Sequence, residues 1–189
     1  RHVPDSEDSD LFWRLQERGT LVNLPEVLVK YRVHSASISS TLHNGRIMAV
    51  GSQLGALSAL RRRSGKSDLA FAPALHQALK QAPNLEAMAQ LACEGLESDE
   101  AGHLRVAAAC KLMELARYRP FEPDLSDCAF IRSALPFAAA LTPQNRKEVR
   151  WYLSVTAARL ARKGKLAEAL ALTPPRLYMT TAARIALGR

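Results

Sequence analysis

From Asn44 onward, apolar side chains recur every three or four residues, which is the spacing of one face of an α-helix. The first run includes Ile47, Val50 and Leu54 and ends at residues 61–63, three arginines whose positive charges suit a helix C-terminus. Aromatic residues make up only 6% of the chain and alanine is abundant, which favours closely packed helices over a β-sandwich. The chain is therefore predicted to be mainly α-helical.

The same spacing, with proline as punctuation, predicts the later helices. They cover residues 68–82, 85–96, 99–118, 127–141, 142–164 and 165–172. Thr142-Pro143 is the clearest helix start, because a capping residue precedes a proline in the first turn. The last two helices, separated by Gly164, resemble one tetratricopeptide unit without a clear second copy, and Pro174-Pro175 interrupts the pattern. We expect a helical hairpin here.

Residues 1–42 follow a different pattern. Acidic residues crowd the start of a predicted helix that is capped by Asp5 or Ser6 and ends at Gly19. Two β-branched stretches, 20–23 and 27–33, then predict short strands. The sequence therefore divides into residues 1–42 and a helical domain at residues 43–189.

The positive charge lies in the second part. Residues 1–42 hold five Lys/Arg against six Asp/Glu, whereas residues 43–189 hold twenty-one against twelve. Such a surface suits anionic lipid headgroups, a phosphorylated substrate or nucleic acid, or is simply a solvated helical face. No recognition helix or aromatic stacking pattern is present, so nucleic acid is not an expected partner.

Three cysteines, Cys93, Cys110 and Cys128, are odd in number and lack metal-ligand spacing. They are interpreted as reduced thiols in a cytoplasmic protein. No run reaches the roughly 18 to 20 apolar residues that a membrane span needs, and the first residues lack the apolar run of a signal peptide. Because the chain begins with Arg1 rather than methionine, we expect an upstream portion.

One stretch carries a specific motif. It reads EDSDLFWRL at 7–15, glycine at 19, NLPEVL at 23–28, YRVH at 31–34 and SIS at 37–39. In residue type, order and spacing it resembles the end of the catalytic domain of family 2 glycosyltransferases, which have the GT-A fold of nucleotide-diphospho-sugar transferases. The resemblance implies that residues 1–42 are a short α/β remnant of a GT-A domain, followed by an all-helical accessory domain.

The resemblance also implies an inverting sugar transfer from a nucleotide-diphosphate donor to an acceptor hydroxyl. Asp8 matches the family's general base, and Glu7 would orient the acceptor. Asp10 is a candidate for substrate or phosphate binding, and it is equally placed to form a structural pair with Arg14 four residues later.

His34 matches the histidine that in some members helps to hold a divalent cation, Mn²⁺ or Mg²⁺, and Arg32 is a phosphate-binding candidate. The family's amino-terminal Asp-x-Asp motif and nucleotide-binding sheet have no counterpart, so the chain alone is predicted to be inactive. The implied partners are a nucleotide-sugar and a glycan or lipid-linked acceptor, with peripheral contact at the inner face of a membrane.

A second hypothesis remains open. In this alternative, the chain is a basic helical-repeat module that binds other proteins without catalysis, and its acidic first helix is incidental. A nucleotide-binding half encoded upstream of Arg1 distinguishes the enzyme from this module.

Overall fold

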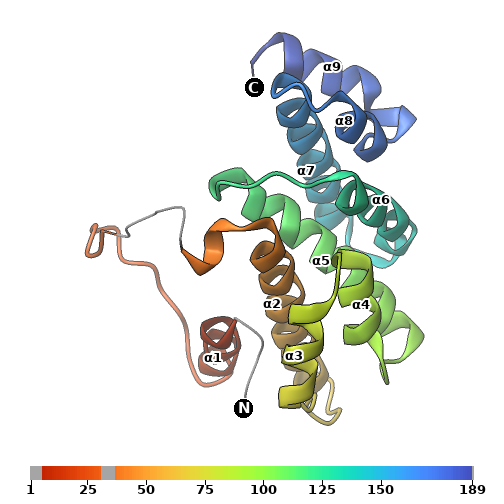
Figure 1. The fold of residues 1–189 in the computed structure, drawn as a ribbon. Helices are drawn as coiled ribbons and strands as arrows, with labels where there is room; N and C mark the ends of the chain where they lie inside the picture. The colour runs from red at the N-terminus through yellow and green to blue at the C-terminus, as the bar shows by residue number, and fades with distance from the viewer. Residues whose placement is uncertain (1–5, 31–36, 189) are drawn as a thin grey trace.

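The computed structural model describes residues 6–30 and 37–188, and this part of the chain is built from helices (Figure 1). Nine α-helices and three short 3-10 helices (η) account for its regular structure, and no strand occurs in these residues. The elements are α1 Glu7–Gln16, η1 Ile38–Ser40, α2 Leu42–Arg63, α3 Pro73–Gln81, α4 Leu85–Cys93, α5 Ser98–Tyr118, α6 Leu125–Ala134, η2 Leu135–Ala140, α7 Pro143–Arg162, α8 Leu166–Leu172, η3 Pro175–Leu177 and α9 Tyr178–Ala186. The prediction of a mainly α-helical chain is confirmed.

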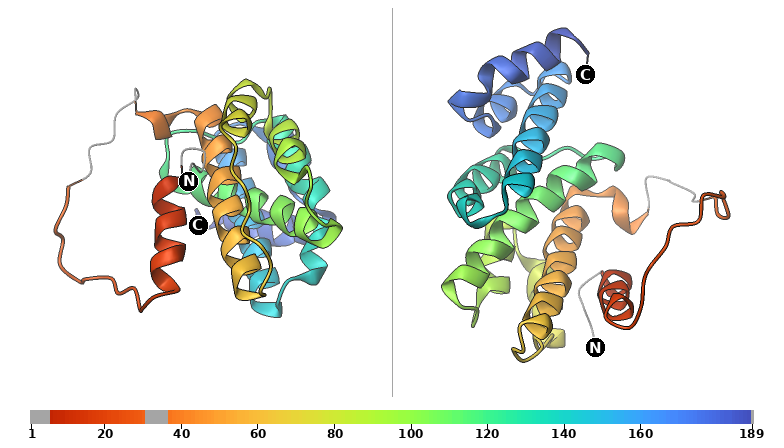
Figure 2. Two further views of the ribbon diagram at one scale, coloured as in Figure 1. Left: turned by 90° about the horizontal axis from the view of Figure 1, so that it is seen from below. Right: turned by 180° about the vertical axis from the view of Figure 1, so that it is seen from behind.

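The two long helices α2 and α5 pack against each other at the centre of the molecule. Helices α3 and α4 cover one side, and α1 lies along α2 (Figure 1). At the other end, α7 packs against α8 and α9, so that the predicted hairpin of α7 and α8 is present and α9 adds a third helix. Residues 17–30 run away from the helices (Figure 2).

The core runs through the molecule without a break. It is filled by aliphatic and sulfur-containing side chains from α2 to α8, together with the rings of Phe121 and Phe130. The largest fully buried members are Ile47, Leu79, Leu85, Met88, Leu104, Leu112, Met113, Phe130, Ile131, Leu153, Leu160 and Leu172. Among the described helices, none is long and apolar enough to cross a membrane.

Some predicted helix boundaries move for local reasons. The helix expected at 68–82 begins only at Pro73. Before it, the Ser58 hydroxyl donates a hydrogen bond to the Asp68 carboxylate and accepts one from the Leu69 N–H at 3.1 Å, so the backbone there is held outside a helix. The helix expected at 85–96 ends at Cys93, and Gly95 follows with a φ of 77° that favours glycine. Both helices are therefore shorter than expected, because a side-chain hydrogen bond or a glycine stabilises a non-helical backbone conformation at one end.

The helix expected at 127–141 starts earlier and changes type. It begins at Leu125 and passes into the 3-10 helix η2 at Leu135, directly before Pro136, whose ring cannot continue the α-helical hydrogen bonding. Helix α9 was not predicted after Pro174-Pro175, where the two prolines turn the chain and a new helix begins.

The predicted strands at 20–23 and 27–33 are wrong wherever the structure describes them. Residues 17–30 form no ladder, and their side chains are exposed, with Val27 at 88%. A strand needs a partner for its backbone groups, and no described segment lies alongside to supply one. Residues 31–33 lie outside the described part of the chain.

A buried ion pair joins α2 to α6. Arg46 is 6% exposed and Asp127 is 0% exposed, and the guanidinium donates two hydrogen bonds to that carboxylate, at 2.8 and 3.1 Å. Arg46 also donates to Asp124, the N-cap of α6. Asp124 and Asp127 complete a capping box, with hydrogen bonds of 3.0 and 3.1 Å between each carboxylate and the other's backbone N–H.

Removing one partner of this pair should strongly destabilise the protein. We expect Asp127→Ala to lower the free energy of unfolding by about 3–5 kcal/mol, because Arg46 stays buried without its main anion. Urea unfolding followed by circular dichroism measures this. Asp99→Ala, at an exposed position in the first turn of α5, serves as the control and should cost less than about 0.5 kcal/mol. A loss below about 1 kcal/mol for Asp127→Ala would show that the pair is dispensable.

Candidate functional site

The acidic segment predicted as the site forms the start of α1, and a small-residue face of α2 holds this helix in place. Gly51, Ser52 and Gly55 are buried on α2. The backbone of α1 comes so near that a Cβ on Gly55 would lie 3.7 Å from the Cα of Asp10. The Ser6 hydroxyl, at the N-cap of α1, donates to the Met48 carbonyl at 3.4 Å. Small residues on α2 therefore set the position of the acidic turn.

Charged contacts hold the second half of α1. The Arg14 guanidinium donates to Asp10 at 3.0 Å and to Asp68 at 2.6 Å. One turn further, Glu17 pairs with Arg62 at 2.6 Å, and Trp13 lies 5.6 Å from the Arg63 guanidinium carbon. The predicted structural pair of Asp10 with Arg14 is present.

Glu7 and Asp8 are placed differently from Asp10. Both carboxylates are exposed, and in the described part of the chain neither pairs with a cation. The Asp8 carboxylate accepts a hydrogen bond of 2.7 Å from the backbone N–H of Ser9, in the first helical turn where the backbone dipoles favour negative charge. Asp8 is thus an accessible carboxylate on a docked helix.

The other predicted site residues, Arg32 and His34, lie outside the described part of the chain. Within the described residues, no three His, Cys, Asp or Glu side chains are grouped to hold a metal ion. Asp10, the nearest buried carboxylate, is occupied by Arg14. The described residues by themselves therefore do not fit the Mn²⁺ or Mg²⁺ ion that the resemblance implies.

Exposed apolar side chains occur on α1 and in the segment that follows it. On α1, Leu11, Phe12 and Leu15 are exposed, Phe12 at 54%. In the following segment the exposed apolar residues are Leu21, Val22, Leu24, Val27, Leu28 and Val29. Uncovered apolar side chains in this number are typical of a segment that packs against another protein surface.

The docking of α1 should depend on the size of residue 55. We expect Gly55→Leu to displace α1 and to speed amide hydrogen exchange in residues 7–16 roughly tenfold, since overpacking costs about 1–3 kcal/mol. Hydrogen-exchange mass spectrometry measures this. Gly55→Ala is the matched control, because a Cβ there meets only ordinary contact distances. Equal exchange in Gly55→Leu and the wild type would contradict this docking.

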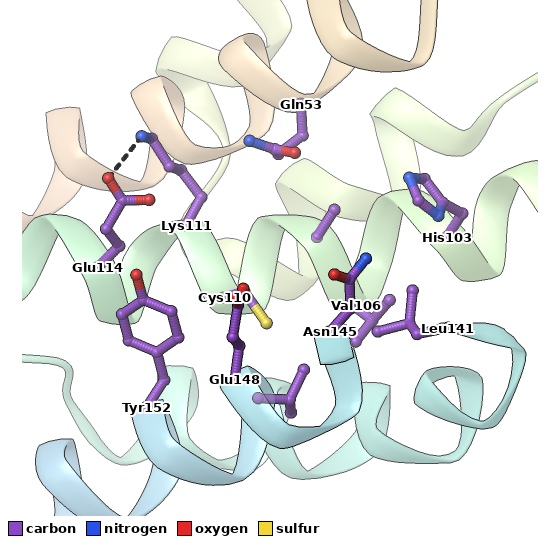
Figure 3. A pocket seen from close by; sticks show the side chains of 12 residues that line it. Gln53, His103, Val106, Cys110, Lys111, Glu114, Leu141, Asn145, Glu148 and Tyr152 are labelled. Carbon is purple, nitrogen blue, oxygen red and sulfur yellow. Dashed lines mark hydrogen bonds and ion pairs between the residues drawn. The ribbon is translucent and has the colours of Figure 1, made fainter. Parts of the chain in front are cut away.

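A second candidate is a cavity of about 310 Å³ between α2, α5 and α7 (Figure 3). Its floor is apolar, with Val106, Leu141 and Val149, and the polar groups come from all three helices. They are Gln53, His103, Cys110, Lys111, Glu114, Asn145, Glu148 and Tyr152. Lys111 and Glu114 pair with each other at 3.0 Å. Sequence reasoning missed this cavity, and one signal for it was present: His103 and Cys110 are seven residues apart and share a face of α5.

Burial favours the neutral forms of three groups in this cavity, His103, Cys110 and Tyr152. Burial lowers the pKa of the His103 imidazole. Burial, with smaller contributions from Glu148 and Glu114, raises the pKa of the Cys110 thiol to about 12. Burial also raises the pKa of the Tyr152 hydroxyl. The cavity therefore offers hydrogen bonds to a small polar molecule, but it contains no activated nucleophile.

Cys110 should be unreactive in the folded protein. With a pKa of about 12, its thiolate fraction at pH 8 is roughly a thousandth of that of an ordinary thiol. We expect iodoacetamide to alkylate Cys110 at least about 100-fold more slowly than in the unfolded chain, with a roughly tenfold gain in rate from pH 8 to pH 9. Peptide mass spectrometry of the alkylated protein measures both. Equal rates in the folded protein and in guanidinium chloride would contradict the raised pKa.

Comparison with known proteins identified no relative of this chain. No family model matches the sequence, and no curated protein or solved structure matches it either. The resemblance of residues 7–39 therefore stands on the motif itself, and the function that it implies is a proposal.

Proposed function

We propose that residues 7–39 form the end of the catalytic domain of an inverting, family 2-like glycosyltransferase, and that the helices from α2 onward are its accessory domain. The domain division at residues 42 and 43 is part of this proposal. The observation that carries it is a difference between two acids that are two residues apart on α1. Asp10 is buried against Arg14, whereas Asp8 is exposed and pairs with no cation in the described part of the chain. The motif assigns the base role to Asp8.

The uncovered apolar surface supports the same proposal. Leu11, Phe12 and Leu15, with the apolar side chains of residues 21–29, supply a face on which a nucleotide-binding α/β half would pack. Strands in residues 20–33 would then find their backbone partners in the sheet of that half.

In the proposed reaction, the Asp8 carboxylate takes the proton of the acceptor hydroxyl while the acceptor oxygen bonds to the anomeric carbon of the donor. The bond from that carbon to the diphosphate breaks, and its electron pair leaves with the nucleoside diphosphate. Attack from the face opposite the leaving group inverts the anomeric centre. The docked helix α1 supplies the rigidity that a general base needs.

Two proteins test the proposal: the present chain, and the product of its gene with everything encoded upstream of Arg1. The chain alone should transfer no sugar from a nucleotide-sugar, because the donor-binding motif is not in it. The full gene product should release nucleoside diphosphate in the presence of a glycan or lipid-linked acceptor. A gene that encodes no α/β nucleotide-binding half would refute the proposal.

In the active full-length protein, we expect Asp8→Asn to reduce transfer by about 10²–10⁴-fold, because the amide cannot accept the proton. Its thermal unfolding should be unchanged, since among the described residues the carboxylate forms hydrogen bonds only with Ser9. Asp10→Asn is the contrasting variant: it weakens the pair with Arg14 and should lower stability more than the rate. Full activity of Asp8→Asn would remove Asp8 from the base role.

The alternative, a protein-interaction module, is favoured by one observation. The groove between α7, α8 and α9 has a volume of about 310 Å³ and an almost wholly apolar lining, including Leu166, Leu170, Tyr178 and Ile185. A groove of this kind suits the apolar face of a helix. If the complete gene product transfers no sugar and Leu170→Asp abolishes capture of a defined helical partner, the module is the better description.

A further inference from the structure

The net positive charge of the protein lies in its last three α-helices and the segments joining them. Residues 143–189 contain ten Lys/Arg and two Glu, a net charge of +8. Residues 1–142 contain sixteen Lys/Arg and sixteen Asp/Glu and are neutral. The whole net charge of the chain therefore belongs to a quarter of its length.

Four arginines of this end and its neighbour α6 line one cavity of about 530 Å³, called here the arginine cavity. Arg132 comes from α6, Arg146 and Arg150 lie one turn apart on α7, and Arg176 belongs to η3. The remaining lining is apolar: Leu135, Pro136, Ala138, Ala139, Val149 and Pro174. None of the described residues that line it is acidic.

These guanidinium groups differ from the other arginines that hold the fold together. Arg46, Arg61 and Arg105 each pair with a carboxylate within 3 Å. In the described part of the chain, none of the four cavity arginines forms an ion pair. Arg146 donates only to the Ala139 carbonyl, at 3.1 Å, and one terminal nitrogen of Arg132 is shielded from solvent without a hydrogen-bond partner. Such a buried donor is costly unless an anion meets it.

We propose that the arginine cavity binds a phosphate-bearing ligand, either a diphosphate or a phosphate ester whose adjoining part is apolar. The guanidinium fork matches phosphate oxygens with paired hydrogen bonds, and four positive charges exceed what a single carboxylate needs. The apolar walls accommodate the uncharged part of such a molecule. The site lies away from α1 and does not depend on the glycosyltransferase proposal.

The fold brings these arginines together from three separate elements. Pro174 turns the chain after α8, so that η3 sets Arg176 across from the face of α7 that bears Arg146 and Arg150. Pro136, in η2, lines the cavity together with Arg132. A solvated charge run on a single helix does not gather cations from three elements around one cavity, which is why the cavity indicates a site.

Isothermal titration with inorganic pyrophosphate, in 100 mM NaCl, tests the proposal. We expect saturable binding by the wild type, and weaker binding of sulfate, which carries less charge. Arg150→Gln and Arg176→Gln should each weaken pyrophosphate binding at least about tenfold, the loss expected for a charge-assisted hydrogen bond. Lys147→Gln is the matched control, because it removes the same charge from an exposed position on α7 outside the lining. It should change affinity less than twofold.

The outcomes separate cleanly once circular dichroism establishes that each variant folds. Absence of pyrophosphate binding at millimolar concentration would overturn the proposal. Equal losses of affinity in Lys147→Gln and Arg150→Gln would overturn it too, since binding would then depend on the overall positive potential of this end and not on the cavity. Single-stranded nucleic acid binding without pyrophosphate binding would overturn it too.

The source of the phosphate group is decided with vesicles of phosphatidylcholine containing 30% phosphatidylglycerol. Binding that pyrophosphate competes away, and that Arg150→Gln loses, assigns the cavity to a lipid phosphate. Pyrophosphate binding without vesicle binding assigns it to a soluble ligand. Both results support the site.

Discussion

The buried contact of Arg46 with Asp127 and Asp124 is the interaction on which the arrangement of the helices depends. A charge this far from water is tolerable only with an opposite charge and satisfied hydrogen bonds, and the α6 capping box supplies both. The contact joins residues 81 positions apart. Because α6 packs in turn on α5 and α8, its position also decides where the cationic end of the molecule lies.

Two uses of arginine follow from this organisation. In the half built on α2, the guanidinium groups face carboxylates from other elements: Arg61 meets Glu100, and Arg62 meets Glu17 and Asp68. These pairs tie α1 and α5 to α2. In residues 143–189, ten Lys/Arg stand against two Glu, and Arg146, Arg150 and Arg176 line one cavity. Mutual repulsion there opposes folding, so a bound anion would stabilise this end.

Helices that are specified by local signals were predictable, and elements that need a distant partner were not. Thr142-Pro143 starts α7 as expected, with the Thr142 hydroxyl accepting from the Asn145 N–H at 3.2 Å. The β-branched residues 20–30 met no partner strand in the described structure, so their pattern alone could not make them a sheet. Of the candidate site, the pairing of Asp10 with Arg14 was readable, because four residues make one helical turn.

By itself, the sequence determined that this chain is mainly helical, where most of its helices lie, and that an acidic turn opens α1. These features depend on contacts a few residues apart, which the order of side chains already contains. Only the tertiary structure decided that Asp8 is left exposed while Asp10 is buried, and that four arginines from α6, α7 and η3 line one cavity. Burial and enclosure are set by which helices meet, and residues more than forty positions apart meet only when the core closes.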